Sequence, residues 1–229
     1  MSEFASQSAA EDVPDIVIRR LPVYARELGL LVSEGREYIS SQELGQRLQV
    51  TPAQIRKDLS YFGRFGKQGR GYEVQELRER LRRILGLNGH VQQLVLVGVG
   101  RLGRALLGYG DFHRQGFEVV RAFDLDPART NKIIENVRVD HVNTLRQFLE
   151  DHPVPMGIVA VPAHAAQEVV ETLVRGGVRA ILSYAPITTS VPDGIHLRQI
   201  DPVMELESMA YYLPHSDDPS DQEPTGWVA

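Results

Sequence analysis

The chain has 229 residues, of which 42% are apolar and 24% charged, as is ordinary for a folded protein of one or two domains. It contains no cysteine, which excludes disulfides, thiol catalysis and cysteine-ligated metals. Its 7 histidines form no HxxxH or HExxH pair, so we expect no metal site. No apolar run of about 18 residues and no basic-then-apolar start occur, so we expect a cytoplasmic protein without a membrane span.

The net charge of −5 hides an uneven distribution. Residues 16–83 contain 14 Arg and Lys against 8 Asp and Glu, whereas residues 87–229 contain 11 against 18. Basic charge confined to one part of a chain is typical of a domain that contacts phosphates. A solvated helix face would give the same imbalance, so charge alone does not decide between them.

The first half of the chain predicts three short helices. A near-helical apolar period predicts the first, and Ser40 or Ser41 is the expected N-cap of the second. Thr51 as N-cap and Pro52 at the first helical position then predict an immediate restart. The expected ranges are 16–34, 41–48 and 52–61.

A glycine- and cation-rich loop follows over residues 63–71. We expect Tyr72–Val74 to be the return strand of a small hairpin. A charged helix over 76–85 and a glycine-flanked boundary at 86–89 end this part of the chain.

The last two helices, about three residues apart, and the loop after them have the pattern of a helix-turn-helix with a wing. Ile55 and Leu59 are expected to pack inward, which leaves polar and cationic side chains for the DNA grooves and phosphates. The candidate DNA-binding residues are Gln54, Arg56, Lys57, Ser60, Arg64, Lys67 and Arg70. The alternative is a small helical domain that serves only packing and is followed by a charged surface loop.

The second half alternates apolar strands with helices, which predicts a parallel, doubly wound sheet and therefore an α/β chain. The expected strands are 93–97, 118–123, 157–161, 179–184 and 196–200, and the expected helices are 101–114, 163–175 and 202–213. The domains are then a disordered leader at 1–15, a winged helix at 16–86, a Rossmann domain at 87–201, a C-terminal helix at 202–213 and a disordered tail at 214–229.

A GxGxxG motif follows the first of these strands and opens a helix, as dinucleotide binding requires. Its glycines allow a tight turn, close approach of the pyrophosphate and close helix packing. Asp124, at the end of the next strand, would accept hydrogen bonds from the ribose and favour NAD(H) over NADP(H); Asp126 is the alternative. The candidate cofactor-binding residues here are Gly98, Val99, Gly100, Arg101, Leu102, Gly103 and Asp124.

No catalytic residue is expected, because a dehydrogenase needs a substrate site and a proton-transfer group, and the chain has no room for a substrate domain. His164 is better explained as a cap or a pocket-lining residue. Apolar linings that would favour the uncharged, reduced nicotinamide are Pro162, Ala163, Tyr184 and Pro186. Three alternatives stay open: an NAD-dependent dehydrogenase, a coenzyme A-binding Rossmann enzyme, and an architectural DNA-binding protein with a vestigial Rossmann fold.

Four segments taken together closely resemble the Rex family of redox-sensing repressors. They are Ser41-Gln42-Glu43-Leu44-Gly45, Gln54-Ile55-Arg56-Lys57-Asp58-Leu59-Ser60-Tyr61-Phe62-Gly63, Gly69-Arg70-Gly71-Tyr72 and Gly98-Val99-Gly100-Arg101-Leu102-Gly103. The resemblance runs from about Ile16 to Leu213.

The resemblance implies a homodimeric repressor that binds palindromic operator DNA and is released by NADH, with NADH and NAD⁺ as effectors. It implies that the last helix is exchanged between subunits. Tyr109 is implied to lie near a cofactor pocket that the two subunits share. Arg20, Tyr109 and Asp201 are the residues implied to form a switch contact.

Overall fold

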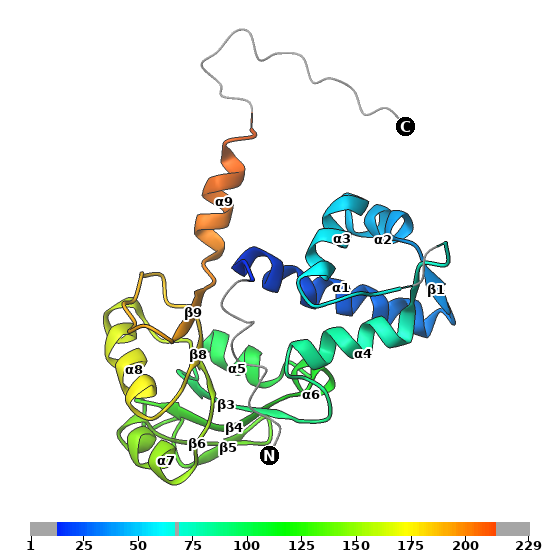
Figure 1. The fold of residues 1–229 in the computed structure, drawn as a ribbon. Coiled ribbons are helices and arrows are strands. Elements are labelled where there is room, and N and C mark those ends of the chain that lie inside the picture. The colour runs from blue at the N-terminus through cyan, green and yellow to red at the C-terminus, as the bar shows by residue number, and fades with distance from the viewer. Residues whose placement is uncertain (1–12, 67–68, 214–229) are drawn as a thin grey trace, which may run out of the picture. The chain divides into compact units, whose positions relative to one another are not determined.

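A computed structural model describes residues 13–66 and 69–213. It divides into two compact units, residues 1–91 and 92–229, each of which is described by itself (Figure 1). The expected leader at 1–15 lies almost entirely outside the described residues, and so do the tail at 214–229 and Lys67.

The N-terminal unit is helical, and local capping sets its helix starts. Ser40 Oγ accepts the backbone N–H of Glu43 at 3.0 Å, and Thr51 Oγ1 accepts that of Gln54 at 3.2 Å. Both expected N-caps are therefore confirmed, and Pro52 occupies the first turn of its helix. The elements are α1 (Asp15–Ser33), β1 (Tyr38–Ile39), α2 (Ser41–Leu48), α3 (Pro52–Ser60), β2 (Tyr72–Glu73) and α4 (Val74–Ile84).

The prediction of a local hairpin that ends in Tyr72–Val74 is wrong, because the partner strand lies elsewhere in the chain. Tyr72 pairs antiparallel with Ile39, and Glu73 with Tyr38, so β2 pairs with a strand that lies before α2. Gly71 makes this possible, because a Cβ there would lie 2.5 Å from the carbonyl oxygen of Ile39. The wing is consequently a loop between α3 and β2 that is anchored at its base by long-range pairing.

One apolar cluster holds the N-terminal unit together. It takes Leu21, Tyr24 and Leu28 from α1, which packs against α4, and Ile55 and Leu59 from α3. Ile55 and Leu59 are 0% and 2% exposed, as their four-residue spacing predicts. The outer face of α3 is thereby fixed toward solvent.

The second unit is a seven-stranded sheet in the order β5-β6-β4-β3-β7-β8-β9. All pairs are parallel except β5 with β6 at one edge. Without β5, this is the Rossmann order, in which the chain reverses direction across the sheet between β3 and β7. The strands are β3 (Gln92–Val97), β4 (Phe117–Asp124), β5 (Lys132–Ile134), β6 (Val137–His141), β7 (Met156–Val159), β8 (Ala180–Ser183) and β9 (His196–Gln199).

Helices cover both faces of this sheet, because successive residues of a buried strand point to opposite sides. Val95 and Val97 join a core with α7 (Leu145–Asp151) and α8 (Ala163–Arg175). Leu94 and Leu96 join a second core, to which α5 (Arg101–Leu107) and α6 (Asp111–Gln115) contribute. The carboxyl ends of β3, β4 and β7 are therefore held at one edge.

Several expected elements of the second unit have different bounds. The single helix expected at 101–114 is split into α5 and α6 around Gly108-Tyr109-Gly110, where the glycines interrupt the helix. The segments β5, β6 and α7 were not predicted. The last helix, α9, spans Pro202–Ala210 and ends earlier than expected. Among the described residues, no helix is both long enough and apolar enough to cross a bilayer.

Candidate dinucleotide site and nucleic-acid interface

The loop between β3 and α5 has the steric features that a GxGxxG fingerprint requires. Gly98 has φ +97°, and a Cβ there would collide with the carbonyl oxygen of Ala160 after β7. A Cβ on Gly103 would collide with the carbonyl oxygen of Gly98, so α5 lies directly against the loop. A Cβ on Gly100 would meet no atom within 4 Å. The first and third glycines therefore serve packing, whereas Gly100 faces open space.

Asp124 ties the end of β4 to this loop. Its carboxylate accepts the Val99 N–H at 2.6 Å and the Asp126 N–H at 2.8 Å, and Arg129 Nη1 lies 3.4 Å from both oxygens. A carboxylate has about four acceptor positions, so these contacts nearly fill it. Asp126 is more open, with 43% of its side chain exposed. Both candidate carboxylates lie at the expected place, and Asp126 has more capacity left for a ribose hydroxyl.

A cavity of about 1110 Å³ opens at the carboxyl ends of the strands. Gly98, Gly100 and Arg101 line it from the glycine loop, and Pro162 and Tyr184 from the ends of β7 and β8. Rossmann folds bind dinucleotides at this position, where the strand order reverses. Burial raises the pKa of the Tyr184 phenol, which favours its neutral form. The cavity thus joins the glycine loop to a mixed lining, in which Pro162 and Tyr184 are uncharged whereas Arg146 and Glu168 carry charge.

Not every sequence-predicted cofactor residue lines this cavity. Leu102, Asp124 and Pro162 do, and His164 does as well. Val99 is fully buried and Gly103 lies under the loop, so these two support the site from behind. Tyr109 is 51% exposed, packs edge-on against Phe112 and is not among the lining residues.

Part of the lining was not predicted from the sequence. The polar residue Asn143 comes from the turn between β6 and α7, and Arg146 comes from the first turn of α7, neither of which was predicted. Arg129 was missed as well; the Asp-x-x-Arg spacing after Asp126 is a local signal that could have found it.

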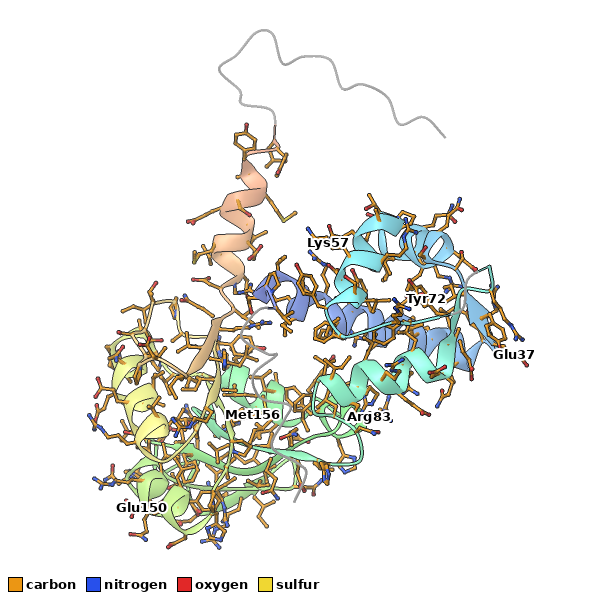
Figure 2. All side chains as sticks on the ribbon, viewed as in Figure 1. Glu37, Lys57, Tyr72, Arg83, Glu150 and Met156 are labelled. Atoms are coloured by element: carbon orange, nitrogen blue, oxygen red, sulfur yellow. The ribbon has the colours of Figure 1, made fainter. Side chains whose placement is uncertain are left out.

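The helix α3, which is the expected recognition helix, and the wing carry cations that have no carboxylate partner within the described residues. Several other arginines of the N-terminal unit are paired; Arg36 lies 2.7 Å from Glu43, and Arg47 lies 2.8 Å from Glu27. Arg56 instead donates from Nη1 to Ser41 Oγ at 2.7 Å, and Lys57 is exposed at the periphery of this unit (Figure 2). These side chains are available to phosphates and base edges.

The other candidate DNA-binding residues are mostly accounted for. The Ser60 hydroxyl donates to the Lys57 carbonyl at 2.7 Å and keeps its acceptor capacity. In the wing, Arg70 lies over the Tyr38 ring at 4.1 Å, and the carbonyl of Arg64 accepts from Arg80 at 3.2 Å. The base of the wing is thus braced while Arg64 and Arg70 stay exposed.

A buried carboxylate lies behind the recognition helix. Asp58 is 0% exposed and accepts hydrogen bonds from Arg20 Nε at 2.6 Å, Arg20 Nη2 at 2.8 Å, Tyr24 Oη at 2.6 Å and Gln54 Nε2 at 2.6 Å. Desolvation would raise the pKa of Asp58, but the hydrogen bonds from Arg20, Tyr24 and Gln54 together hold it below its ordinary value. The carboxylate is therefore ionised and fully engaged.

Sequence reasoning missed this cluster, although the helical period carries a signal for it. Asp58 is three residues after Ile55 and one before Leu59, which places it on the buried face of α3.

The three residues suggested for a switch contact lie in different units. Arg20 is bound to Asp58 inside the N-terminal unit. Asp201 is the N-cap of α9 and accepts the Val203 N–H at 2.9 Å. The α9 segment has no buried residue and exposes apolar side chains all along its length. These are Val203, Met204, Leu206, Met209, Tyr211, Tyr212 and Leu213.

Comparison with known proteins agrees with the two-part architecture. Residues 12–60 match a family model described as "Putative DNA-binding protein N-terminus", and residues 91–187 match one described as "CoA binding domain". A solved structure of RSP in complex with β-NAD⁺ and operator DNA is 38% identical, with a TM-score of 0.83 over 87% of this chain and 92% of that one. RSP in complex with β-NADH is 36% identical, with a TM-score of 0.79 over 88% of this chain and 94% of that one.

Curated relatives cover nearly the whole chain. The redox-sensing transcriptional repressor Rex of Chloroflexus aurantiacus is 51% identical over 200 residues, which are 87% of this chain and 94% of that protein. The Rex protein of a Roseiflexus species is 50% identical over 203 residues, covering 89% and 92%. The solved structures confirm the expected helical DNA-binding domain and Rossmann-like sheet, and the curated relatives confirm the expected repressor. The chain belongs to the Rex family of redox-sensing transcriptional repressors.

Proposed function

We propose that this repressor binds palindromic operator DNA as a homodimer in the cytoplasm and leaves it when NADH occupies the Rossmann cavity. One observation carries the proposal: the same chain has two features. Cations without carboxylate partners lie on α3 and the wing, and an open glycine loop lies where the strand order of the sheet reverses. The solved relative RSP, described with β-NAD⁺ and operator DNA and with β-NADH, supports both ligands.

Discrimination between NADH and NAD⁺ must arise at the nicotinamide, because the two forms differ there by a hydride and a ring charge. The neutral phenol of Tyr184 and the ring of Pro162 offer a lining that favours the uncharged, reduced form. Converting a population from 1:99 to 99:1 takes about 5.5 kcal/mol of differential binding. Two cofactor sites per dimer would each supply roughly half.

A dimer is supported by α9, whose apolar side chains have no partner inside the described chain. Exchange of this helix between subunits would cover them. Two recognition helices must then lie about 34 Å apart to bind half-sites one DNA turn apart. The cofactor-dependent state of the dimer would set this spacing.

The switch contact among Arg20, Tyr109 and Asp201 belongs to the same proposal. The guanidinium of Arg20 would exchange its bonds to Asp58 for bonds to Asp201, and Asp201 would lose its capping bond to Val203. The exchange would leave the buried Asp58 without its charged partner, so the difference in cofactor affinity would have to offset that cost as well.

Operator binding titrated with NADH against a constant NAD⁺ background tests the function. A labelled duplex selected from a randomised palindromic library serves as the probe, with fluorescence anisotropy at fixed salt. We expect NADH to lower operator affinity while NAD⁺ alone leaves it unchanged. Equal operator affinity with and without NADH would refute the redox control.

A further inference from the structure

The buried carboxylate of Asp58 sets the orientation of one half-buried side chain in the first turn of α3. Its oxygens accept four hydrogen bonds, two from Arg20, one from Tyr24 and one from the Gln54 amide. Four is about the number that a carboxylate can accept. The donors on α1 lie 38 and 34 residues from Asp58 along the chain, so α1 holds Asp58 from behind.

The Gln54 amide can face an ionised carboxylate in only one way. Asp58 is acceptor-only in this state, so the amide must present its NH₂ group, as the 2.6 Å contact from Nε2 to Asp58 Oδ1 requires. The carbonyl oxygen of Gln54 then points away from Asp58. Gln54 is the third residue of α3 and is only half-buried, and recognition helices read bases with their N-terminal residues.

We propose that Gln54 reads an adenine in the operator and that Asp58, anchored by Arg20 and Tyr24, is its positioning residue. The inference rests on the proposed operator binding. The outward Oε1 accepts a hydrogen bond, and in the major groove only adenine N6 and cytosine N4 donate one. The second N–H of Gln54 can donate to adenine N7, so adenine alone satisfies both groups. Guanine and thymine offer acceptors where Oε1 needs a donor.

The fixed orientation of the Gln54 amide also reduces the entropy that is lost when DNA binds. A free glutamine side chain would lose rotamer entropy on binding, whereas the bond to Asp58 immobilises the Gln54 amide before DNA arrives. This explains why a charged, fully buried group is kept within the recognition helix.

The test measures a specificity profile for the full-length chain. The wild type first selects its sequence from a randomised palindromic duplex library. Anisotropy then gives the affinity for duplexes in which each half-site base pair is replaced in turn. We expect one A·T pair whose replacement costs the wild type roughly 5- to 150-fold and costs Gln54→Met less than about twofold. Gln46→Met, at an exposed glutamine of α2, is the matched control and should keep the wild-type profile.

Asp58→Asn tests the positioning role. We expect Asp58→Asn to remove the preference at the same base pair as Gln54→Met does. The double variant should show no further loss of preference there. Should Asp58→Asn not fold, hydrogen exchange in the wild type decides: the Gln54 side-chain amide protons should exchange more slowly than those of Gln46, and equal rates would overturn the positioning role.

The outcomes separate this inference from the proposed function. Gln54→Met could keep the wild-type specificity profile, or lose affinity equally for every sequence. Either result would overturn the base-reading role while leaving operator binding intact. An Asp58→Asn profile that keeps the wild-type preference would overturn the positioning role. Failure of the wild type to enrich any sequence would overturn operator binding and this inference together.

Discussion

Two alanine substitutions in the glycine loop distinguish a cofactor function from a folding function. At Gly100 the backbone has φ −72°, which alanine adopts freely, and no atom lies within 4 Å of an added Cβ. At Gly103 the same methyl group would collide with the backbone carbonyl of Gly98. Gly100→Ala should therefore change the free energy of unfolding by less than about 1 kcal/mol, whereas Gly103→Ala should lower it by about 1–3 kcal/mol or more.

The effect on cofactor affinity should run differently. A methyl group on Gly100 occupies the space through which the pyrophosphate approaches the loop amides. Loss of one hydrogen bond to a charged phosphate costs about 1.5–3 kcal/mol, so the Kd for NADH should rise roughly 10- to 150-fold in Gly100→Ala. Nicotinamide fluorescence reports the Kd, and urea unfolding followed by circular dichroism reports stability.

Either of two results would refute this reasoning. Wild-type NADH affinity in Gly100→Ala would mean that the pyrophosphate does not lie over the loop. A stability loss in Gly100→Ala as large as that in Gly103→Ala would mean that the space above Gly100 is not open.

Three further predictions concern DNA, stability and assembly. Lys57→Ala should weaken binding about equally for all sequences and reduce the slope of log K against log salt by about 0.9, measured by anisotropy at several salt concentrations; an unchanged slope would place Lys57 away from the phosphates. Arg20→Ala should lower the free energy of unfolding by about 3 kcal/mol at pH 7, because it leaves Asp58 buried without its partner. Since the folded pKa of Asp58 lies below its unfolded value of about 3.9, this contribution is present above about pH 4 and should fade as pH falls through the folded pKa. Urea unfolding at pH 7 and pH 3 measures it, and equal losses at both would contradict the assignment. Truncation after Asp201 should give a monomer by analytical ultracentrifugation, whereas a stable dimer would show that α9 is not needed for assembly.

Local signals explain which parts of the fold could be predicted from the sequence. The bounds of α2 and α8 match their predicted ranges, because Ser40 caps the first and a regular apolar period runs through the second. The pairing of Tyr38–Ile39 with β2 could not be predicted, since two-residue strands have no periodicity and their partners are distant in sequence. The edge strand β5 escaped for the same reason, because it is only 3 residues long.

The same difference between local and long-range signals decides which site residues could be predicted. The glycine loop and Asp124 were found because six consecutive residues and one strand end contain the whole signal. The Asp58 cluster joins residues that are 38 positions apart, and no spacing rule connects them. The lining contributed by Asn143 and Arg146 depends on a segment whose helix was not predicted. Site residues that lie within one loop can therefore be predicted from this sequence, whereas site residues that are brought together by tertiary packing cannot.

The distribution of ion pairs in the N-terminal unit carries a final consequence. Arg36 and Arg47 are paired with glutamates, which lowers repulsion between like charges on that side. Arg56, Lys57 and Arg70 keep no such partner within the described residues, although pairing them would stabilise the free domain. Sequences that break a local rule usually do so where they function. Phosphates would neutralise these cations, so operator DNA should raise the stability of this unit through mass action, and added salt should weaken that gain.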